Sequence, residues 1–174
     1  MKKTKWIPAL LAIIFIGISS FKKPDFITSK YYIIISKTNN TLTLYDKDDW
    51  IYEYPCTFGN DDLGDKMMEG DKKTPEGIYK IIYKKPHAKW NKMLMLDYPN
   101  ETDKAKFSKR KQDGKIPAKA RIGGGIAIHG TWRNDDRAVD ELQNWTEGCI
   151  SMFNADLNEL YSIIEPGTQV IIKR

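Results

Sequence analysis

The chain has 174 residues, of which 41% are hydrophobic and 11% aromatic, a size and composition typical of one globular domain. Its formal net charge of +5 falls to +2 when residues 1–20, which contain three lysines and no acids, are left out. So mild a charge argues against the concentrated basic surface that nucleic-acid binding requires, and it suits an anionic cell wall as well as ordinary solubility.

The first 20 residues have the layout of a secretory signal peptide. Lysines precede an apolar run, residues 6–18, and small residues follow it. The run is shorter than the roughly 20 residues that a membrane-spanning helix needs. We therefore expect a cleaved signal over residues 1–20, a tether over 21–29, one domain over 30–174, and a location in the periplasm or cell envelope.

The hydrophobic pattern predicts a mainly β domain. Residues 31–35 form a continuous apolar run, and residues 41–45 alternate after a Thr-Asn-Asn turn, which together indicate a hairpin. A third strand places Cys56 on one face with three aromatic residues, so we expect a small buried thiol there. Further strands are expected at residues 78–83, 93–98, 126–129 and 169–173.

The remaining stretches predict a loop and one or two helices. Residues 57–73 are rich in Gly and Asp and predict a long loop, a feature that is often functional in compact domains. Residues 102–111 fit either an exposed helix capped by Thr102 or a solvated charged segment. Residues 155–164 predict a helix with an apolar stripe, capped by Asn154.

Two histidines and two cysteines supply the candidate chemistry. A thiol attacks as the thiolate, so a catalytic cysteine needs a base nearby. His87 lies in a polar segment and is expected at the surface, whereas His129 ends an apolar strand that can aim it at a cleft. Gly148 precedes Cys149 in a tight turn, where the N–H groups of both residues could form an oxyanion hole.

The residues alone leave two interpretations of His129 and Cys149 open: a base with its nucleophile, or a core histidine and a structural thiol. A disulfide between Cys56 and Cys149 would suit an exported protein, but a domain of about 150 residues needs no such link. The Cys and His residues are too scattered for a metal site. Glycines 123–125 lack the nucleotide-binding spacing, so we expect no metal and no cofactor.

The stretch from His129 to Ser151 resembles the L,D-transpeptidases of the YkuD-like domain family. In that family a histidine is followed, after a gap, by Ser or Thr, His, Gly, Cys, a hydrophobic residue, and Asn or Arg. Here His129 is followed, after 16 intervening residues, by the matching residues Thr146, Gly148, Cys149 and Ile150. Segments 73–79, 96–100 and 122–124 are also family-like, and the resemblance spans about residues 31–173.

The resemblance implies a catalytic β-sandwich with one or two short flanking helices that acts on peptidoglycan stem tetrapeptides. Separately, we expect a monomer. Cys149 would be the nucleophile, His129 the proton donor and acceptor, and the Gly130 carbonyl the group that orients the imidazole. The thioester formed on release of D-alanine would pass to an amine, in a cross-link or a wall-attached protein, or to water. Oxyanion or substrate contacts would come from Gly148, Thr146, Glu147, Ser151, Trp132 and Arg133.

Two positions depart from the family pattern. Glu147 stands where a second histidine is common, and Ser151 replaces the usual Asn or Arg. A carboxylate beside the thiol would raise the pKa of Cys149 unless it turns away or pairs with Arg133 or Arg137. Three functions stay open: an L,D-transpeptidase, a hydrolase on the same scaffold (an L,D-carboxypeptidase or an amidase that releases wall proteins), and a non-catalytic wall-binding module.

Overall fold

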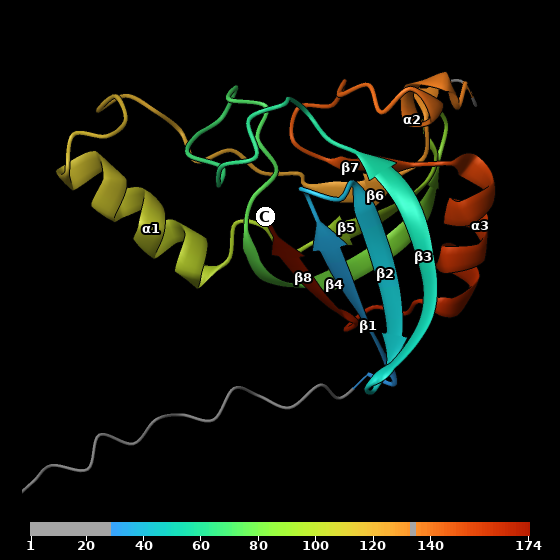
Figure 1. Cartoon of the computed structure of the whole chain (residues 1–174). Helices are drawn as coiled ribbons and strands as arrows, with labels where there is room; N and C mark the ends of the chain where they lie inside the picture. Colours follow the sequence, from blue (N-terminus) through green and yellow to red (C-terminus); the bar gives the residue numbers. More distant parts are fainter. Residues whose placement is uncertain (1–28, 133–134) are drawn as a thin grey trace, which may run out of the picture.

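The computed structural model describes residues 29–132 and 135–174 (Figure 1). The predicted signal segment and all but the last residue of the predicted tether lie outside the described residues, and so does Arg133.

The described residues contain eight β-strands that close into a barrel-like β-sandwich in the order β1-β2-β3-β7-β6-β5-β4-β8. β3 and β4 belong to both sheets, so the two layers are joined at both edges. This arrangement confirms the predicted mainly β fold. The strands are β1 (Tyr31–Ser36), β2 (Thr41–Asp46), β3 (Asp49–Thr57), β4 (Gly77–His87), β5 (Asn91–Leu96), β6 (Ala127–His129), β7 (Ile150–Met152) and β8 (Gln169–Lys173).

Alternate residues of these strands fill the interior, as the two-residue period of a strand requires. Ile33 and Ile35 of β1 face inward beside Leu42 and Leu44 of β2, and all four are almost fully buried. The hairpin predicted at residues 31–45 is confirmed, and β8 has the predicted bounds. The burial of this apolar surface, at roughly 25 cal/mol per Å², is the main force that stabilises the barrel.

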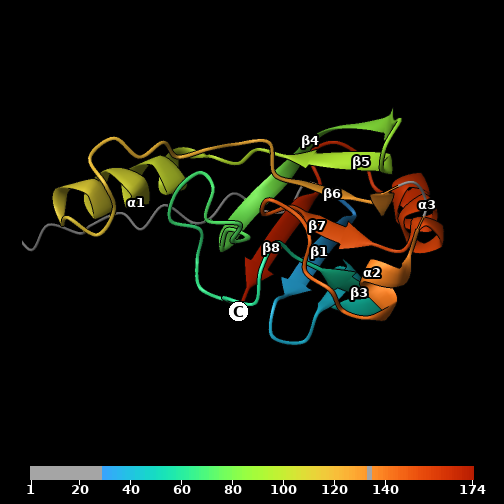
Figure 2. The same ribbon diagram turned by 90° about the horizontal axis from the view of Figure 1, so that it is seen from above.

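Helix α1 (Glu101–Gln112) projects away from the barrel (Figures 1 and 2). Its cap is Asn100 and not the predicted Thr102, because Asn100 and Asp103 form a reciprocal capping box. The helix is also more than a solvated segment: Asp103 is buried and accepts a hydrogen bond of 3.0 Å from the Tyr79 hydroxyl, and Arg110 binds Asp65 at 2.6 Å.

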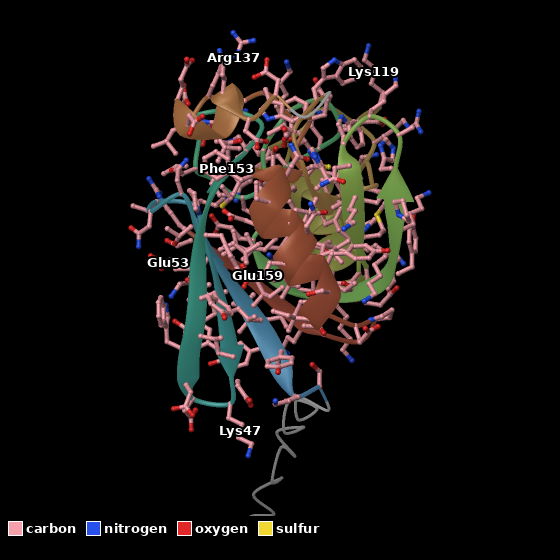
Figure 3. All side chains as sticks on the ribbon, turned by 90° about the vertical axis from the view of Figure 1, so that its right-hand side faces the viewer. Lys47, Glu53, Lys119, Arg137, Phe153 and Glu159 are labelled. Atoms are coloured by element: carbon pink, nitrogen blue, oxygen red, sulfur yellow. The ribbon has the colours of Figure 1, made fainter. Side chains whose placement is uncertain are left out.

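Helix α3 (Asn154–Ile163) covers one side of the barrel against β5, and Figure 3 shows Phe153 at its start. The predicted cap, Asn154, does not cap the helix, since its side chain donates to Thr131 and Asp136. A one-turn helix that the sequence pattern did not predict, α2 (Arg137–Asp140), lies nearby. No helix within the described residues is long and apolar enough to cross a bilayer.

Candidate active site

Two short strands bring His129 and Cys149 together. β6 pairs in parallel with β7, with Ile128 opposite Ile150 and His129 opposite Ser151. Paired residues of neighbouring strands share a face, and so do residues two apart on one chain. Cys149, which directly precedes β7 and lies two residues before Ser151, is therefore on the same face as the His129 imidazole at the end of β6.

The His129 ring is oriented by the next residue in the chain. Its Nδ1 lies 2.6 Å from the Gly130 carbonyl oxygen. Because a carbonyl can only accept, Nδ1 carries the proton, which leaves Nε2 with a free lone pair. Gly130 fits here because a Cβ atom would lie 2.3 Å from Asn154 Oδ1 and 3.0 Å from the Trp90 carbonyl oxygen.

Aromatic rings enclose the imidazole. Trp90, from the β4–β5 turn, stacks on His129 with a centroid distance of 4.6 Å, and Trp145 meets it edge-on at 5.6 Å. His87 stacks on the other side of Trp90 at 4.4 Å and accepts the Lys89 and Trp90 N–H groups. His87 is thus half-buried in this stack, although its polar neighbours predicted a surface position.

Burial sets the protonation state of the imidazole. His129 is 1% exposed. Desolvation lowers its pKa to about 4, even though the hydrogen bond to Gly130 favours the protonated form. His129 is therefore neutral at pH 7, with Nε2 ready to accept a proton.

The turn before Cys149 is held by Thr146. Its hydroxyl donates to the Cys149 carbonyl oxygen at 2.8 Å and accepts the Gly148 N–H at 3.2 Å. The Gly148 N–H is therefore already used, which leaves the Cys149 N–H as the remaining donor of the predicted oxyanion pair. Gly148 has a φ of 121°, and a Cβ atom there would lie 2.6 Å from the Lys73 carbonyl oxygen.

The thiol of Cys149 is also kept neutral at rest. Burial raises its pKa, while a hydrogen bond from the Ala127 backbone and the charge of Lys66 oppose that effect. Its Sγ lies 3.5 Å from the Gly125 carbonyl oxygen. Both cysteines are free, and Cys56 is fully buried as predicted. The site thus holds a neutral thiol and a neutral imidazole.

Two of the predicted contact residues point inward. Ser151 has no exposed surface, and its Oγ lies 3.5 Å from the Gly130 carbonyl oxygen that also binds His129. Thr146 is likewise buried in its turn. A buried hydroxyl offers no surface to a ligand, so in this conformation both residues shape the site from behind rather than line it.

The side chain of Glu147 points into solvent. Its side chain is 73% exposed, and it pairs with Lys72 at 3.5 Å. Of the two arginines predicted as partners, Arg133 lies outside the described residues. Arg137 instead pairs with Asp135, and Figure 3 shows it at the α2 end of the molecule. The carboxylate that the sequence placed beside the thiol is therefore directed away from it.

Two hollows border the segment that leads to Cys149. The first, of about 360 Å³, is lined by Trp132, Trp145 and residues of the α2 region. The second, of about 370 Å³, is lined by Lys66, Glu147 and the backbone of Gly70, Gly123 and Gly124. Among the described residues, no three His, Cys, Asp or Glu side chains converge as a metal site requires.

Sequence reasoning missed Trp90, Trp145 and Lys66. The two tryptophans lie far apart in the chain and meet only around His129, so no local spacing identifies them. Lys66 is one of several lysines in a polar loop, and only the fold buries it. Trp132 was predicted; its ring is partly exposed, with the Lys89 ammonium 5.2 Å from the ring centroid.

Comparison with known proteins gives consistent matches. YafK of Escherichia coli K12 is 28% identical over 139 residues, which cover 76% of this chain and 54% of that protein. YkuD of Bacillus licheniformis is 27% identical over 161 residues, 89% of this chain and 72% of that protein. The crystal structure of the helical cell shape determining protein Pgp2 from Campylobacter jejuni aligns with a TM-score of 0.60 at 26% identity, covering 83% of this chain and 47% of that one.

The chain spans about half the length of the E. coli and C. jejuni proteins. A family model described as the L,D-transpeptidase catalytic domain matches residues 30–172, almost the whole barrel together with His129 and Cys149. The chain therefore belongs to the YkuD family of L,D-transpeptidase catalytic domains.

Proposed function

We propose that this domain is an exported cysteine L,D-transpeptidase that acts on peptidoglycan stem tetrapeptides. The observation that carries the proposal is the bond from His129 Nδ1 to the Gly130 carbonyl, which leaves an unprotonated Nε2 on the sheet face shared with Cys149. A backbone carbonyl thus does for the imidazole what a carboxylate does in a Ser-His-Asp triad. The family match over residues 30–172 supports the substrate class.

The first half of the reaction makes a thioester. His129 Nε2 takes the thiol proton as Cys149 Sγ attacks the carbonyl that joins the third stem residue to the terminal D-alanine. The resulting oxyanion is stabilised by the Cys149 N–H. The intermediate collapses when the C–N bond breaks, the imidazolium gives its proton to the leaving nitrogen, and D-alanine departs.

The second half transfers the acyl group. An amine attacks the thioester while His129 Nε2 accepts its proton, the C–S bond breaks, and the thiolate regains a proton from the imidazolium. The amine belongs to a second stem peptide, which gives a cross-link, or to a wall-attached protein. The two hollows that border the Cys149 segment support a site with room for a donor and an acceptor.

Hydrolysis on the same scaffold is the second candidate. The departure from the family at Glu147 favours it, because this exposed carboxylate lines a hollow that borders the segment leading to Cys149, where water could replace an amine. The enzyme would then be an L,D-carboxypeptidase or an amidase that releases wall proteins. With either acceptor, the predicted export over residues 1–20 would place the enzyme in the periplasm or cell envelope.

Product analysis tests the proposal. The full chain is incubated with tetrapeptide muropeptides, with and without an added D-amino acid, and products are separated by mass. Release of D-alanine with a new amide bond indicates a transpeptidase, whereas tripeptide alone indicates a hydrolase. Cys149→Ala should abolish both products and Cys56→Ala should retain them. Equal product from Cys149→Ala would overturn the proposal, and no product from the unmutated chain would leave a wall-binding module.

A further inference from the structure

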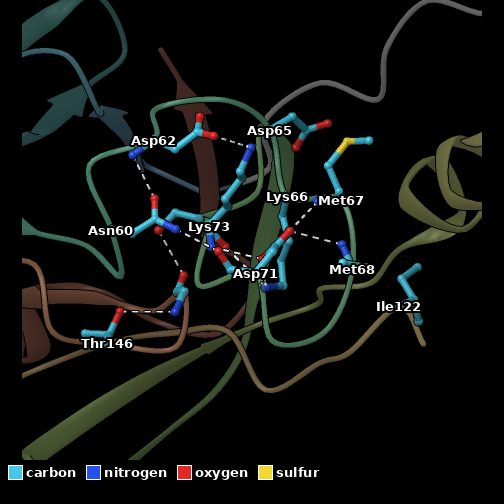
Figure 4. Close-up of polar contacts among 12 residues, drawn as sticks. Asn60, Asp62, Asp65, Lys66, Met67, Met68, Asp71, Lys73, Ile122 and Thr146 are labelled. Carbon is cyan, nitrogen blue, oxygen red and sulfur yellow. Dashed lines mark hydrogen bonds and ion pairs between the residues drawn. The ribbon is translucent and has the colours of Figure 1, made fainter. Parts of the chain in front are cut away.

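Lys66 is a buried cation in the long loop before β4. Its side chain is 3% exposed, and its ammonium donates to Asp71 Oδ1 at 2.7 Å and to the Lys73 carbonyl oxygen at 3.3 Å. Figure 4 shows this cluster together with Lys73 and Thr146. Charged groups are rarely buried unless they are paired, so the loop is built around this pair.

Asp71 keeps the pair charged. Its carboxylate also accepts the N–H groups of Met67, Met68 and Lys73 at 2.6, 3.0 and 3.0 Å (Figure 4). Burial by itself would raise the pKa of Asp71, but the hydrogen bonds from Lys66 and these N–H groups outweigh it and hold the pKa below its ordinary value. The ammonium of Lys66 is therefore fixed in position.

The Lys66 ammonium lies next to the turn of residues 146–149, which carries Cys149. A Cβ atom built on Gly148 would meet Lys66 Nζ at 3.4 Å and the Lys73 carbonyl oxygen at 2.6 Å. Thr74, in the same loop, donates its hydroxyl to the Gly148 carbonyl oxygen at 3.0 Å. Lys66 also lines the hollow that contains Glu147. The loop thus places the positive charge of Lys66 next to Gly148, the residue that precedes Cys149.

The other charged groups near Cys149 do not supply this charge. His129 is neutral at rest, and Glu147 and Lys72 pair in solvent. Glu69, which also lines the hollow that contains Glu147, pairs with Arg121. A buried ion pair is seldom more stabilising than apolar residues of similar volume. The location of Lys66 is therefore better explained by the negative charge that forms beside it than by stability.

We propose that Lys66 is an electrostatic positioning residue whose fixed ammonium stabilises the negative charge that develops at the Gly148–Cys149 turn, first on the thiolate and then on the tetrahedral oxyanion. The stabilisation of the oxyanion rests on the proposed function. The stabilisation of the thiolate concerns ionisation of the Cys149 thiol alone and holds for any reaction at Cys149.

The test is the rate of Cys149 alkylation by iodoacetamide as a function of pH, measured in the full chain with Cys56→Ala as background. Lys66→Met should slow alkylation at pH 7 by about three- to tenfold and move the profile to higher pH, because a nearby cation favours the thiolate. Lys66→Arg should restore the rate to within about twofold, since it keeps the charge.

Lys37→Met is the matched control. Lys37 is as buried as Lys66, pairs with Glu76 at 2.7 Å, and holds the same loop through the Gly64 and Thr74 carbonyl oxygens. If Lys66 only held the loop, the two methionine variants would slow alkylation alike. Asp71→Asn adds an opposite test: it leaves the Lys66 charge uncompensated and should speed alkylation.

Three results would overturn the proposal. The first is a Lys66→Met profile that overlays that of the unmutated protein, and the second is a Lys37→Met rate as slow as that of Lys66→Met. The third is slower alkylation in Asp71→Asn. Alkylation needs no peptidoglycan. A protein that shows the Lys66 effect but releases no D-alanine would therefore refute the proposed function and leave this inference standing.

Discussion

The two halves of the candidate site, around His129 and around Cys149, have different chemical surroundings. His129 is enclosed by Trp90 and Trp145 and fixed by a backbone carbonyl. Cys149 follows a turn held by hydroxyl groups and backed by the Lys66–Asp71 ion pair. One half is apolar and the other is charged.

This difference matches what each group has to do. An apolar enclosure favours a neutral imidazole, the form that can accept a proton. A nearby cation favours an anionic sulfur, the form that attacks. Both groups are neutral at rest, so in the proposed mechanism proton transfer from Cys149 to His129 starts the reaction. The apolar half favours the neutral imidazole before that transfer, and the charged half favours the thiolate after it. Changes to the two halves should therefore have separable effects.

The largest effect should come from removing the base. We expect His129→Gln to lower D-alanine release by at least about 10³-fold, because no other described residue is placed to take the thiol proton. Alkylation of Cys149 at pH 9 should change little, since hydroxide can then replace the base. A His129→Gln enzyme with more than a tenth of the original rate would contradict the assignment.

Gly130→Ala should break the orientation of the base while leaving both reactive groups present. The added methyl group would overlap Asn154 Oδ1 and the Trp90 carbonyl oxygen, so the backbone must move. We expect a loss of about 1–3 kcal/mol in the free energy of unfolding and roughly ten- to hundredfold in turnover. Denaturant unfolding and steady-state kinetics measure the two; unchanged turnover would show that the carbonyl is dispensable.

Acid should destabilise the fold through His129. Its pKa is about 4 when folded and about 6.5 when exposed, so between these values the unfolded chain binds more protons. Stability should therefore rise as pH increases from about 4 to 6.5 and level off above, by up to about 3 kcal/mol. Unfolding midpoints across this range check the slope, which His129→Gln should flatten; an equal slope in the variant would exclude His129 as its source.

Trp90→Leu should loosen the apolar half. Loss of the stack should destabilise the protein by about 1 kcal/mol, and water that enters should raise the pKa of His129 toward its ordinary value. An NMR titration of the imidazole measures this shift. Trp132→Leu is the control, because Trp132 is partly exposed and lines the hollow next to α2, so the pKa of His129 should not move. Equal pKa shifts in both variants would refute the specific role of Trp90.

The smallest effect should come from Glu147→Gln. The Glu147–Lys72 pair is exposed, and such pairs contribute at most about 0.5–1 kcal/mol. We expect unchanged stability and an alkylation rate of Cys149 within about twofold at 0.15 M salt. A much faster alkylation would mean that the carboxylate opposes the thiolate after all.

The sequence predicted the strands that have a clear period. It also predicted the pair formed by His129, at the end of β6, and Cys149, just before β7. It did not predict β7 itself, because three residues in a parallel pair carry no readable alternation. Asn154 has the chemistry of a helix cap, yet Thr131 and Asp136 compete for its side chain. Lys66 and Trp90 depend on contacts between distant segments, which no local pattern encodes.

The central claim is that Cys149 is a nucleophile activated by His129. Intact-protein and peptide mass spectrometry after exposure to a carbapenem tests it most directly, because acylation requires the same attack as the first half of the reaction. We predict one covalent adduct, located on Cys149, absent from Cys149→Ala and formed much more slowly in His129→Gln. No adduct, an adduct on another residue, or equal acylation in His129→Gln would contradict the account.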